Sequence, residues 1–159
     1  MKTENKFLKV AFSSKSDEYS TPLKLFNQLN KEFNFTLDAC ASLENAKCDN
    51  YYTKENNGLL QEWENESVFC NPPYSDIKLW VRKCYQEAKN NKVIVMLIPA
   101  RTDTKYFHNY IYKIAEIRFI KGRISFELEG KKIGEAPFPS MIVVYKDIIK
   151  KELQLDIFE

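Results

Sequence analysis

Histidine and closely paired cysteines are almost absent from this sequence of 159 residues. It has one histidine, His108, and its cysteines form no Cys-x-x-Cys pair: Cys40, Cys48, Cys70 and Cys84. A zinc site needs several such ligands at short spacing, so the sequence disfavours metal chemistry. Cys40 and Cys70 lie in apolar runs, where cysteine acts as a small buried hydrophobe. This usage suits a reducing cytoplasm better than a disulfide framework.

Long apolar runs are missing as well. The opening residues, MKTENKFLKVAF, hold too short an apolar stretch for a signal peptide, and no other run approaches the length of a membrane span. Repeats, low-complexity stretches and linkers are also absent, and a hydrophobic content of 44% is enough for one core. We therefore expect a soluble cytoplasmic protein with no membrane partner. It should form one domain over 1–159, with a polar segment at 1–15 and a tail at 147–159.

Charge of one sign is not in large excess, since the formal net charge is only +2. The two signs are nevertheless separated along the chain: acids dominate from Phe33 to Phe69, and bases dominate from Arg101 to Lys132. A basic stretch of this kind suits contact with a phosphate backbone. An ordinary solvated surface explains it equally well.

The spacing of apolar residues predicts alternating helices and strands. Helices are expected after Thr21, placed as N-cap with Pro22 at the first helical position, after Ser75-Asp76 and after Thr102. Strands are expected at 35–40, 51–53, 68–70, 92–98, 116–120, 124–128 and 141–145. The strands 116–120 and 124–128 should join near Lys121-Gly122. This alternation predicts an α/β fold with a mainly parallel sheet, helices on both faces and an antiparallel edge.

The tetrad Asn71-Pro72-Pro73-Tyr74 follows the apolar run Val68-Phe69-Cys70 directly. A short buried strand that ends in a rigid polar loop is where α/β proteins place chemistry. Asn71 and the carbonyl of Pro72 supply two hydrogen-bond acceptors, and the second proline holds Pro72 extended. Tyr74 adds an aromatic face on which a flat ring can stack, so the tetrad is suited to bind a planar base through its amino group. The alternative is a plain turn after a strand.

The segment Asp38-Ala39-Cys40-Ala41-Ser42 ends the strand expected at 35–40. A carboxylate at a strand end suits an amine or hydroxyl of a ligand, and the small residues after it let a ligand approach the backbone. The segment has none of the glycines of a strong nucleotide fingerprint, so a plain strand-to-loop transition is the alternative. In a parallel sheet this strand can neighbour the strand before Asn71, which would set a cofactor pocket beside a base pocket.

Several short motifs follow one another along the chain: Asp17 to Pro22, Leu37 to Ser42, Asn57-Gly58-Leu59 with Trp63, Asn71 to Tyr74, Pro99 to Thr104, Gly122-Arg123-Ile124 and Pro137 to Ser140. From about Ser16 to Lys146 the chain thereby resembles the phage-type DNA N-6-adenine methyltransferases. These are related to a wider group of amino-methylating enzymes that use S-adenosylmethionine. Asp38 matches the acid of that group's Asp-Pro-Phe-x-Gly-x-Gly pattern, whereas Cys40 and the missing glycines depart from it.

The resemblance implies a single-domain Rossmann-like methyltransferase fold, with S-adenosylmethionine as cofactor and double-stranded DNA as substrate, in a bacterial cell and encoded by a phage or prophage. It implies direct methyl transfer to the N6 amino group of a flipped adenine, which Tyr74 stacks on. The implied catalytic residues are Asn71, Pro72, Pro73 and Tyr74. The implied cofactor-binding residues are Ser20, Thr21, Pro22, Asp38, Ala39, Cys40, Asn57 and Asn71.

The residues expected to bind DNA are Tyr74, Arg101, Lys105, Lys121 and Arg123. Arg101 lies just past the strand 92–98, so it suits a DNA phosphate or a cofactor carboxylate, with a surface salt bridge as the alternative. For Arg123 the alternative is a turn in which it pairs with Glu127. The loops 102–106 and 129–139 are the expected readers of base sequence.

Other substrates fit the same tetrad. The amino group of cytosine and the side-chain amide of a protein glutamine also offer a planar amino nitrogen. A third alternative is a catalytically inactive DNA-binding module of the same fold, which the missing glycines favour and the intact tetrad opposes. The chemistry of the sequence does not separate these acceptors, but the basic stretch and the resemblance favour DNA as the substrate.

Overall fold

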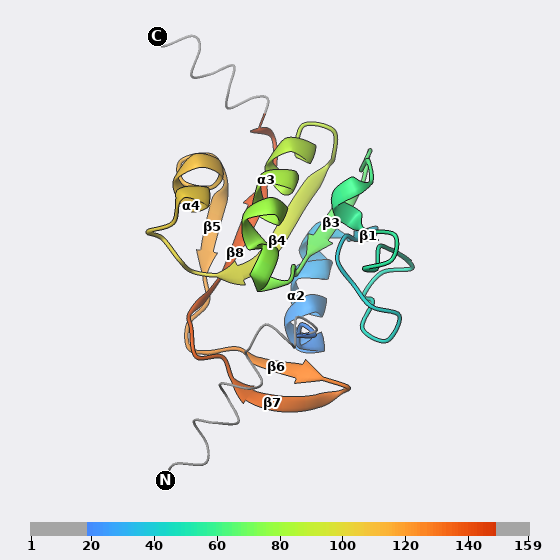
Figure 1. The fold of residues 1–159 in the computed structure, drawn as a ribbon, viewed down its shortest axis with the longest axis vertical. Helices are drawn as coiled ribbons and strands as arrows, with labels where there is room; N and C mark the ends of the chain where they lie inside the picture. Colours follow the sequence, from blue (N-terminus) through green and yellow to red (C-terminus); the bar gives the residue numbers. More distant parts are fainter. Residues whose placement is uncertain (1–18, 149–159) are drawn as a thin grey trace.

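The computed structural model describes residues 19–148, so the segment expected at 1–15 and most of the tail lie outside the described residues. Its centre is a six-stranded sheet of order β2-β1-β3-β4-β8-β5 (Figure 1). The strands are β1 (Leu37–Asp38), β2 (Asn50–Tyr51), β3 (Ser67–Cys70), β4 (Val93–Pro99), β5 (Glu116–Phe119) and β8 (Ser140–Tyr145). Strands β2, β1, β3 and β4 are parallel, and β8 is antiparallel to β4 and β5. The prediction of a mostly parallel sheet with an antiparallel edge is confirmed.

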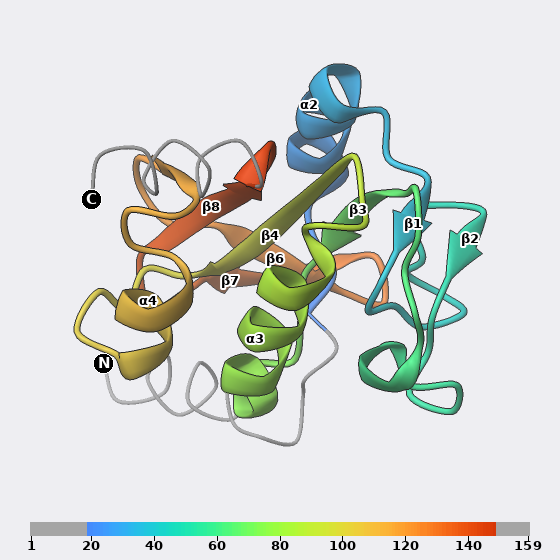
Figure 2. The ribbon, with the colours of Figure 1, turned by 90° about the horizontal axis from the view of Figure 1, so that it is seen from above.

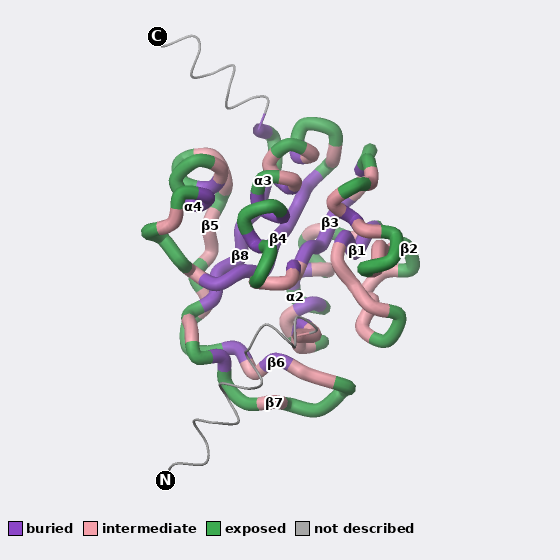
Figure 3. The backbone as a smooth tube through the Cα atoms, in the orientation of Figure 1, coloured by how far each residue is buried: buried purple, intermediate pink, exposed green. Residues whose placement is uncertain are grey.

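Helices cover both faces of the sheet, with α2 (Leu23–Phe33) on one and α3 (Ile77–Glu87) and α4 (Lys105–Tyr110) on the other (Figure 2). Alternate residues of β4 point to opposite faces, as the pleat of a strand requires. Ile94, Met96 and Ile98 pack in the core on the α3 side, and Val93, Val95 and Leu97 pack on the α2 side. Every residue of β4 is buried (Figure 3), which is why this strand is apolar almost throughout.

The start of α2 differs from the prediction. Its N-cap is Pro22, with extended backbone angles and no capping side chain, and the carbonyl of Pro22 accepts from the backbone N–H of Phe26 at 3.1 Å. Thr21 lies one residue before the cap and is buried, with 2% of its surface exposed. Its hydroxyl bonds to a side chain from a distant segment, so the prediction of Thr21 as N-cap was wrong.

A second, two-stranded sheet is formed by β6 (Ser125–Leu128) and β7 (Lys131–Glu135). The predicted neighbours 116–120 and 124–128 are therefore strands of different sheets, because β5 pairs with β8 and β6 pairs with β7. Strand β7 was not predicted, since its sequence KKIGE is largely charged and exposed and has no apolar alternation. The hairpin packs on the α2 side of the core through Phe126, together with Ile124 directly before β6.

Short 3-10 helices complete the described chain: η1 (Gly58–Leu60) and η2 (Tyr74–Asp76), which leads into α3. Gly58 of η1 lies against the backbone of Ala39, directly after β1, and its carbonyl accepts from the indole N–H of Trp63 at 3.1 Å. Between residues 19 and 148, no helix combines the length and apolar character needed to cross a membrane.

We predict that Gly58→Ala destabilises the protein. A Cβ at this position would lie 2.3 Å from the carbonyl oxygen of Ala39 and 3.2 Å from the Trp80 ring. Backbone must then shift, which costs about 1 to 3 kcal/mol of unfolding free energy. Urea unfolding of the variant measures this cost. Leu60→Ala is the control from the same 3-10 helix, because Leu60 is 79% exposed. Equal stabilities of Gly58→Ala and the parent would contradict the close approach.

Candidate active site

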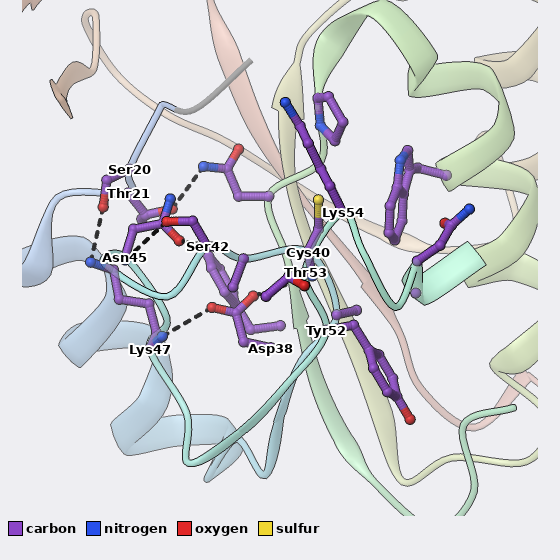
Figure 4. A pocket seen from close by; sticks show the side chains of 18 of the residues that line it. Ser20, Thr21, Asp38, Cys40, Ser42, Asn45, Lys47, Tyr52, Thr53 and Lys54 are labelled. Atoms are coloured by element: carbon purple, nitrogen blue, oxygen red, sulfur yellow. Dashed lines mark hydrogen bonds between the residues drawn. The ribbon is translucent and has the colours of Figure 1, made fainter. Parts of the chain in front are cut away.

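A cavity of about 440 Å³ lies at the carboxyl ends of β1 and β3 (Figure 4). Most residues expected to bind a cofactor line it: Ser20, Thr21, Asp38, Ala39, Cys40, Asn57 and Asn71. Pro22 does not line it. Of the tetrad, Pro73 lines the cavity beside Asn71, whereas Pro72 and Tyr74 do not. The pairing of β1 with β3, in which Asp38 is opposite Phe69, brings the Asp38 loop and the tetrad to one edge of the sheet.

The carboxamide of Asn71 has a defined orientation. Its Nδ2 donates to the carbonyl oxygen of Tyr19 at 2.8 Å and to Oγ1 of Thr21 at 3.0 Å. The hydroxyl of Tyr74 lies 3.5 Å from Asn71 Oδ1, at the outer limit of a hydrogen bond. The amino end of the side chain is thus engaged by the protein, and the oxygen end is left with acceptor capacity.

The ring of Tyr74 is held in an aromatic cluster. It meets Phe138 at a centroid distance of 5.5 Å and an angle of 78°, Phe126 at 6.3 Å and 72°, and Tyr19 at 6.5 Å and 41°. Burial raises the pKa of the Tyr74 hydroxyl, and the negative charge that Tyr19 can carry adds to this effect. The guanidinium of Arg101 lowers the same pKa, so Arg101 acts on this side chain electrostatically.

Asp38 is a buried carboxylate on the cavity wall, with 3% of its surface exposed. Its Oδ2 accepts from the backbone N–H of Lys47 at 3.0 Å, and its Oδ1 accepts from that of Cys40 at 3.4 Å. Desolvation raises the pKa of this carboxyl to about 6, against the lowering effect of the two backbone N–H groups. Cys40 itself is half-buried, unlike Cys70, which is fully buried as predicted.

Asn57 is fixed by the turn that it caps. Its backbone is left-handed, with φ at 45°, and its Oδ1 accepts from the backbone N–H of Leu59 at 3.2 Å. The side chain therefore begins η1 while it also lines the cavity.

Lys47, Ser42 and Asn45 also line the cavity, although the sequence patterns did not predict them there. Lys47 reaches across the loop after β1 to donate from Nζ to Oγ of Ser20 at 3.1 Å (Figure 4). Ser42 and Asn45 close a reciprocal turn: the Ser42 backbone N–H donates to Asn45 Oδ1 at 2.7 Å, and that of Asn45 donates to Ser42 Oγ at 3.2 Å. The spacing Ser42-x-x-Asn45 is the one feature that could have indicated this turn.

The basic residues expected to bind DNA lie outside the cavity, on the surface: Arg101, Lys105, Lys121 and Arg123 are all exposed. Arg118, from the same basic stretch, forms ion pairs with two glutamates. It donates to both carboxylate oxygens of Glu32 at 2.7 Å and to Glu116 at 2.5 Å. Within residues 19–148 no group of histidine, cysteine and acidic side chains is placed to hold a metal ion.

A mostly parallel sheet with a polar cavity at the carboxyl ends of its strands is the architecture of an α/β ligand-binding enzyme. Comparison with known proteins identifies the family. The family model for DNA N-6-adenine-methyltransferase (Dam) matches residues 10–157. The chain therefore belongs to this family, and the resemblance inferred from its motifs is confirmed.

Two phage proteins are similar to the chain. It is 34% identical over 122 residues to a DNA N-6-adenine-methyltransferase of Escherichia phage T1. The aligned residues make up 76% of this chain and 51% of the relative. It is also 32% identical over 139 residues to a DNA N-6-adenine-methyltransferase of Haemophilus phage HP1 (strain HP1c1). Here the aligned residues make up 84% of this chain and 80% of the relative. The chain thus spans about half the length of the phage T1 relative.

The raised pKa of Asp38 predicts a pH dependence of stability that Asp38→Asn removes. The folded chain binds the proton more tightly than the unfolded chain, with a pKa of about 6 against 3.8. Protonation of Asp38 therefore stabilises the folded state in acid. As pH rises from about 4 to about 6 this contribution is lost, and the free energy of unfolding falls by on the order of 2 to 3 kcal/mol. Urea unfolding of parent and variant at intervals from about pH 4 to about pH 7 gives the comparison. Parallel pH profiles for the two proteins would contradict the assignment.

Proposed function

We propose that the chain methylates the N6 amino group of adenine in double-stranded DNA, with S-adenosylmethionine as methyl donor. The observation that carries this proposal is the orientation of Asn71. Its amide oxygen keeps acceptor capacity at the edge of a polar cavity that also contains a buried carboxylate, Asp38. Family membership supports adenine over cytosine or a glutamine amide as the acceptor. The intact tetrad supports an active enzyme over an inactive DNA-binding module.

We further propose that the fold is of the Rossmann-like methyltransferase type. The cavity lies outside the carboxyl ends of β1 and β3, which is where open α/β sheets bind their ligands. Helices on both faces of a mostly parallel sheet agree with this assignment.

The cavity residues fit S-adenosylmethionine. The charged and hydroxyl-bearing parts of this cofactor need polar partners. The Asp38 carboxylate accepts from only two backbone N–H groups, and because a carboxylate has about four acceptor positions, it can still accept hydrogen bonds from the cofactor. Ser20, Thr21, Ala39, Cys40 and Asn57 would complete the cofactor site, with Pro22 setting the start of α2 behind it. When bound, the cofactor supplies an electrophilic methyl group on a sulfonium ion.

The chemistry required of the protein is positioning. The lone pair of the adenine amino nitrogen is delocalised into the ring, so the nitrogen is a poor nucleophile. Hydrogen bonds from its two N–H groups to Asn71 Oδ1 and to the Pro72 carbonyl favour a pyramidal, nucleophilic nitrogen. The bond from the nitrogen to the methyl carbon would form as the bond from that carbon to sulfur breaks, with a neutral thioether as leaving group. The nitrogen would then carry the positive charge and release one proton to water. Pro73 is extended, with φ −60° and ψ 129°, and holds this turn rigid.

The target adenine must leave the duplex to reach Asn71, at a cost of a few kcal/mol. Stacking on Tyr74 offsets part of this cost. The steep angles at which Phe126 and Phe138 meet the Tyr74 ring fix its plane before the base arrives. Arg101, Lys105, Lys121 and Arg123 would contact phosphates along the flanking backbone, because their charges lie on the surface outside the cavity.

We expect Asn71→Ala to slow methyl transfer by about a hundredfold or more, the typical loss for one preorganised hydrogen-bonding group. Cofactor affinity should stay close to that of the parent. Single-turnover transfer from labelled S-adenosylmethionine to plasmid DNA measures the rate, and calorimetry measures the affinity. Asn27→Ala, at an exposed position on α2, is the control. Transfer by Asn71→Ala at the parent rate would rule out the proposed role.

For DNA binding, we expect Arg101→Ala, Lys121→Ala and Arg123→Ala each to weaken affinity on any duplex. Each lost phosphate contact should reduce the slope of log affinity against log salt by about one unit. Arg118→Ala is the matched control, since Arg118 is bound to Glu32 and Glu116. Binding measured over a range of salt on two unrelated duplexes tests this. Unchanged slopes for all three variants would show that DNA approaches another surface.

A further inference from the structure

The orientation of the Asn71 amide follows from the chemistry of its partners. A backbone carbonyl oxygen only accepts hydrogen bonds, so the group that lies 2.8 Å from the Tyr19 carbonyl must be the amino end of the side chain. The second hydrogen of that amino group goes to Thr21 Oγ1 at 3.0 Å. Both amide hydrogens are therefore used within the protein, and rotation of the amide would break both bonds.

Thr21 is a buried partner and not a chance surface contact. Only 2% of its surface is exposed, and the chain turns into α2 at the next residue. Neither Tyr19 nor Thr21 is near Asn71 in the sequence, since they precede it by 52 and 50 residues. Their contact with Asn71 is a product of the fold.

The segment that holds the amide is itself held from two sides. The backbone of Ser20 donates to the Glu127 carbonyl at 2.9 Å and accepts from the Glu127 N–H at 3.1 Å, which ties the segment to β6. The Ser20 hydroxyl accepts from Lys47 Nζ at 3.1 Å, which ties it to the loop after β1 (Figure 4). The partners of the amide are thus fixed before any ligand binds.

We propose that Tyr19 and Thr21 form an amide lock, in which Thr21 is a positioning residue for methyl transfer and the Tyr19 carbonyl selects asparagine over aspartate at position 71. The inference rests on the proposed function for its kinetic consequences. The lock directs Oδ1 away from Tyr19, so that this oxygen is presented to the substrate amino group. An aspartate at position 71 would set an anionic oxygen against the Tyr19 carbonyl, at the position where the amino group now lies 2.8 Å away. Two acceptors repel each other at that distance.

Three variants test the lock through single-turnover rates at saturating cofactor and DNA, where changes in cofactor affinity have no effect. Thr21→Val keeps the size of the side chain and removes the acceptor, so the rate should fall about tenfold, while Thr21→Ser should stay within about twofold of the parent. Asn71→Asp should fall about a hundredfold or more. A Thr21→Val rate equal to that of the parent, or an active Asn71→Asp, would overturn the lock.

A second readout does not depend on activity. With asparagine side chains labelled with ¹⁵N, the Asn71 amide pair is identified by its absence from the Asn71→Ala spectrum. Both amide protons should exchange slowly with water in the parent and in Thr21→Ser, and one should exchange at least about tenfold faster in Thr21→Val. Equal exchange in all three proteins would overturn the lock. A parent that shows slow amide exchange but transfers no methyl group would contradict the proposed function and still support the lock.

Discussion

The site depends on one constraint: the carboxamide of Asn71 is held by the Tyr19 carbonyl and the Thr21 hydroxyl. This contact joins the end of β3 to a segment that also reaches the β6–β7 hairpin through Ser20 and the loop after β1 through Lys47. The end of β3, the hairpin and the loop after β1, which are remote from one another in sequence, therefore all contact the short segment from Tyr19 to Thr21. The aromatic cluster around Tyr74, which includes Tyr19 and Phe126, packs against the same segment and hairpin.

The parallel sheet makes this meeting possible. Because β1 and β3 run side by side in the same direction, the residues after each strand emerge at one edge, and Asp38 and Asn71 line the same cavity. The loop after β1 contains no glycine in the segment Ala39 to Ser42, and the close backbone approach beside it is made by Gly58, from a distant segment. Asp38 remains in a desolvated position that raises its pKa to about 6. A desolvated carboxylate such as Asp38 destabilises the fold. Such a group is typical of binding sites and is uncommon in a core that serves only stability.

Local pattern was enough to predict the features that depend on neighbours in sequence. The strand at β4 follows from its uninterrupted apolar run, and the loop position of Asn71 follows from the apolar residues before it. The placement of Asp38 beside the tetrad followed from the rule that parallel strands share an edge. Family motifs added the chemistry, and the match over residues 10–157 confirms the family.

Features that depend on distant partners were not predictable in the same way. The Thr21 hydroxyl looked like a helix cap because its local sequence fits one, but the partly buried amide of Asn71 is its partner in the structure. Strand β7 is a different case, because its partner β6 is adjacent in sequence, but its charged and exposed residues show no apolar alternation that would indicate a strand. Lys47 lies in a polar stretch with no periodicity, and its contact with Ser20 spans 27 residues. For Thr21 and Lys47 a tertiary contact decides what the local sequence leaves open.

The identity of the methylated atom tests the central claim most directly. Purified protein is incubated with plasmid DNA and S-adenosylmethionine labelled in the methyl group, and the DNA is digested to nucleosides for chromatography and mass spectrometry. Because we propose that Asn71 Oδ1 accepts a hydrogen bond from a flipped adenine, we expect the label in N6-methyladenine nucleoside. Label in a methylated cytosine, or none in DNA, would contradict the proposed function.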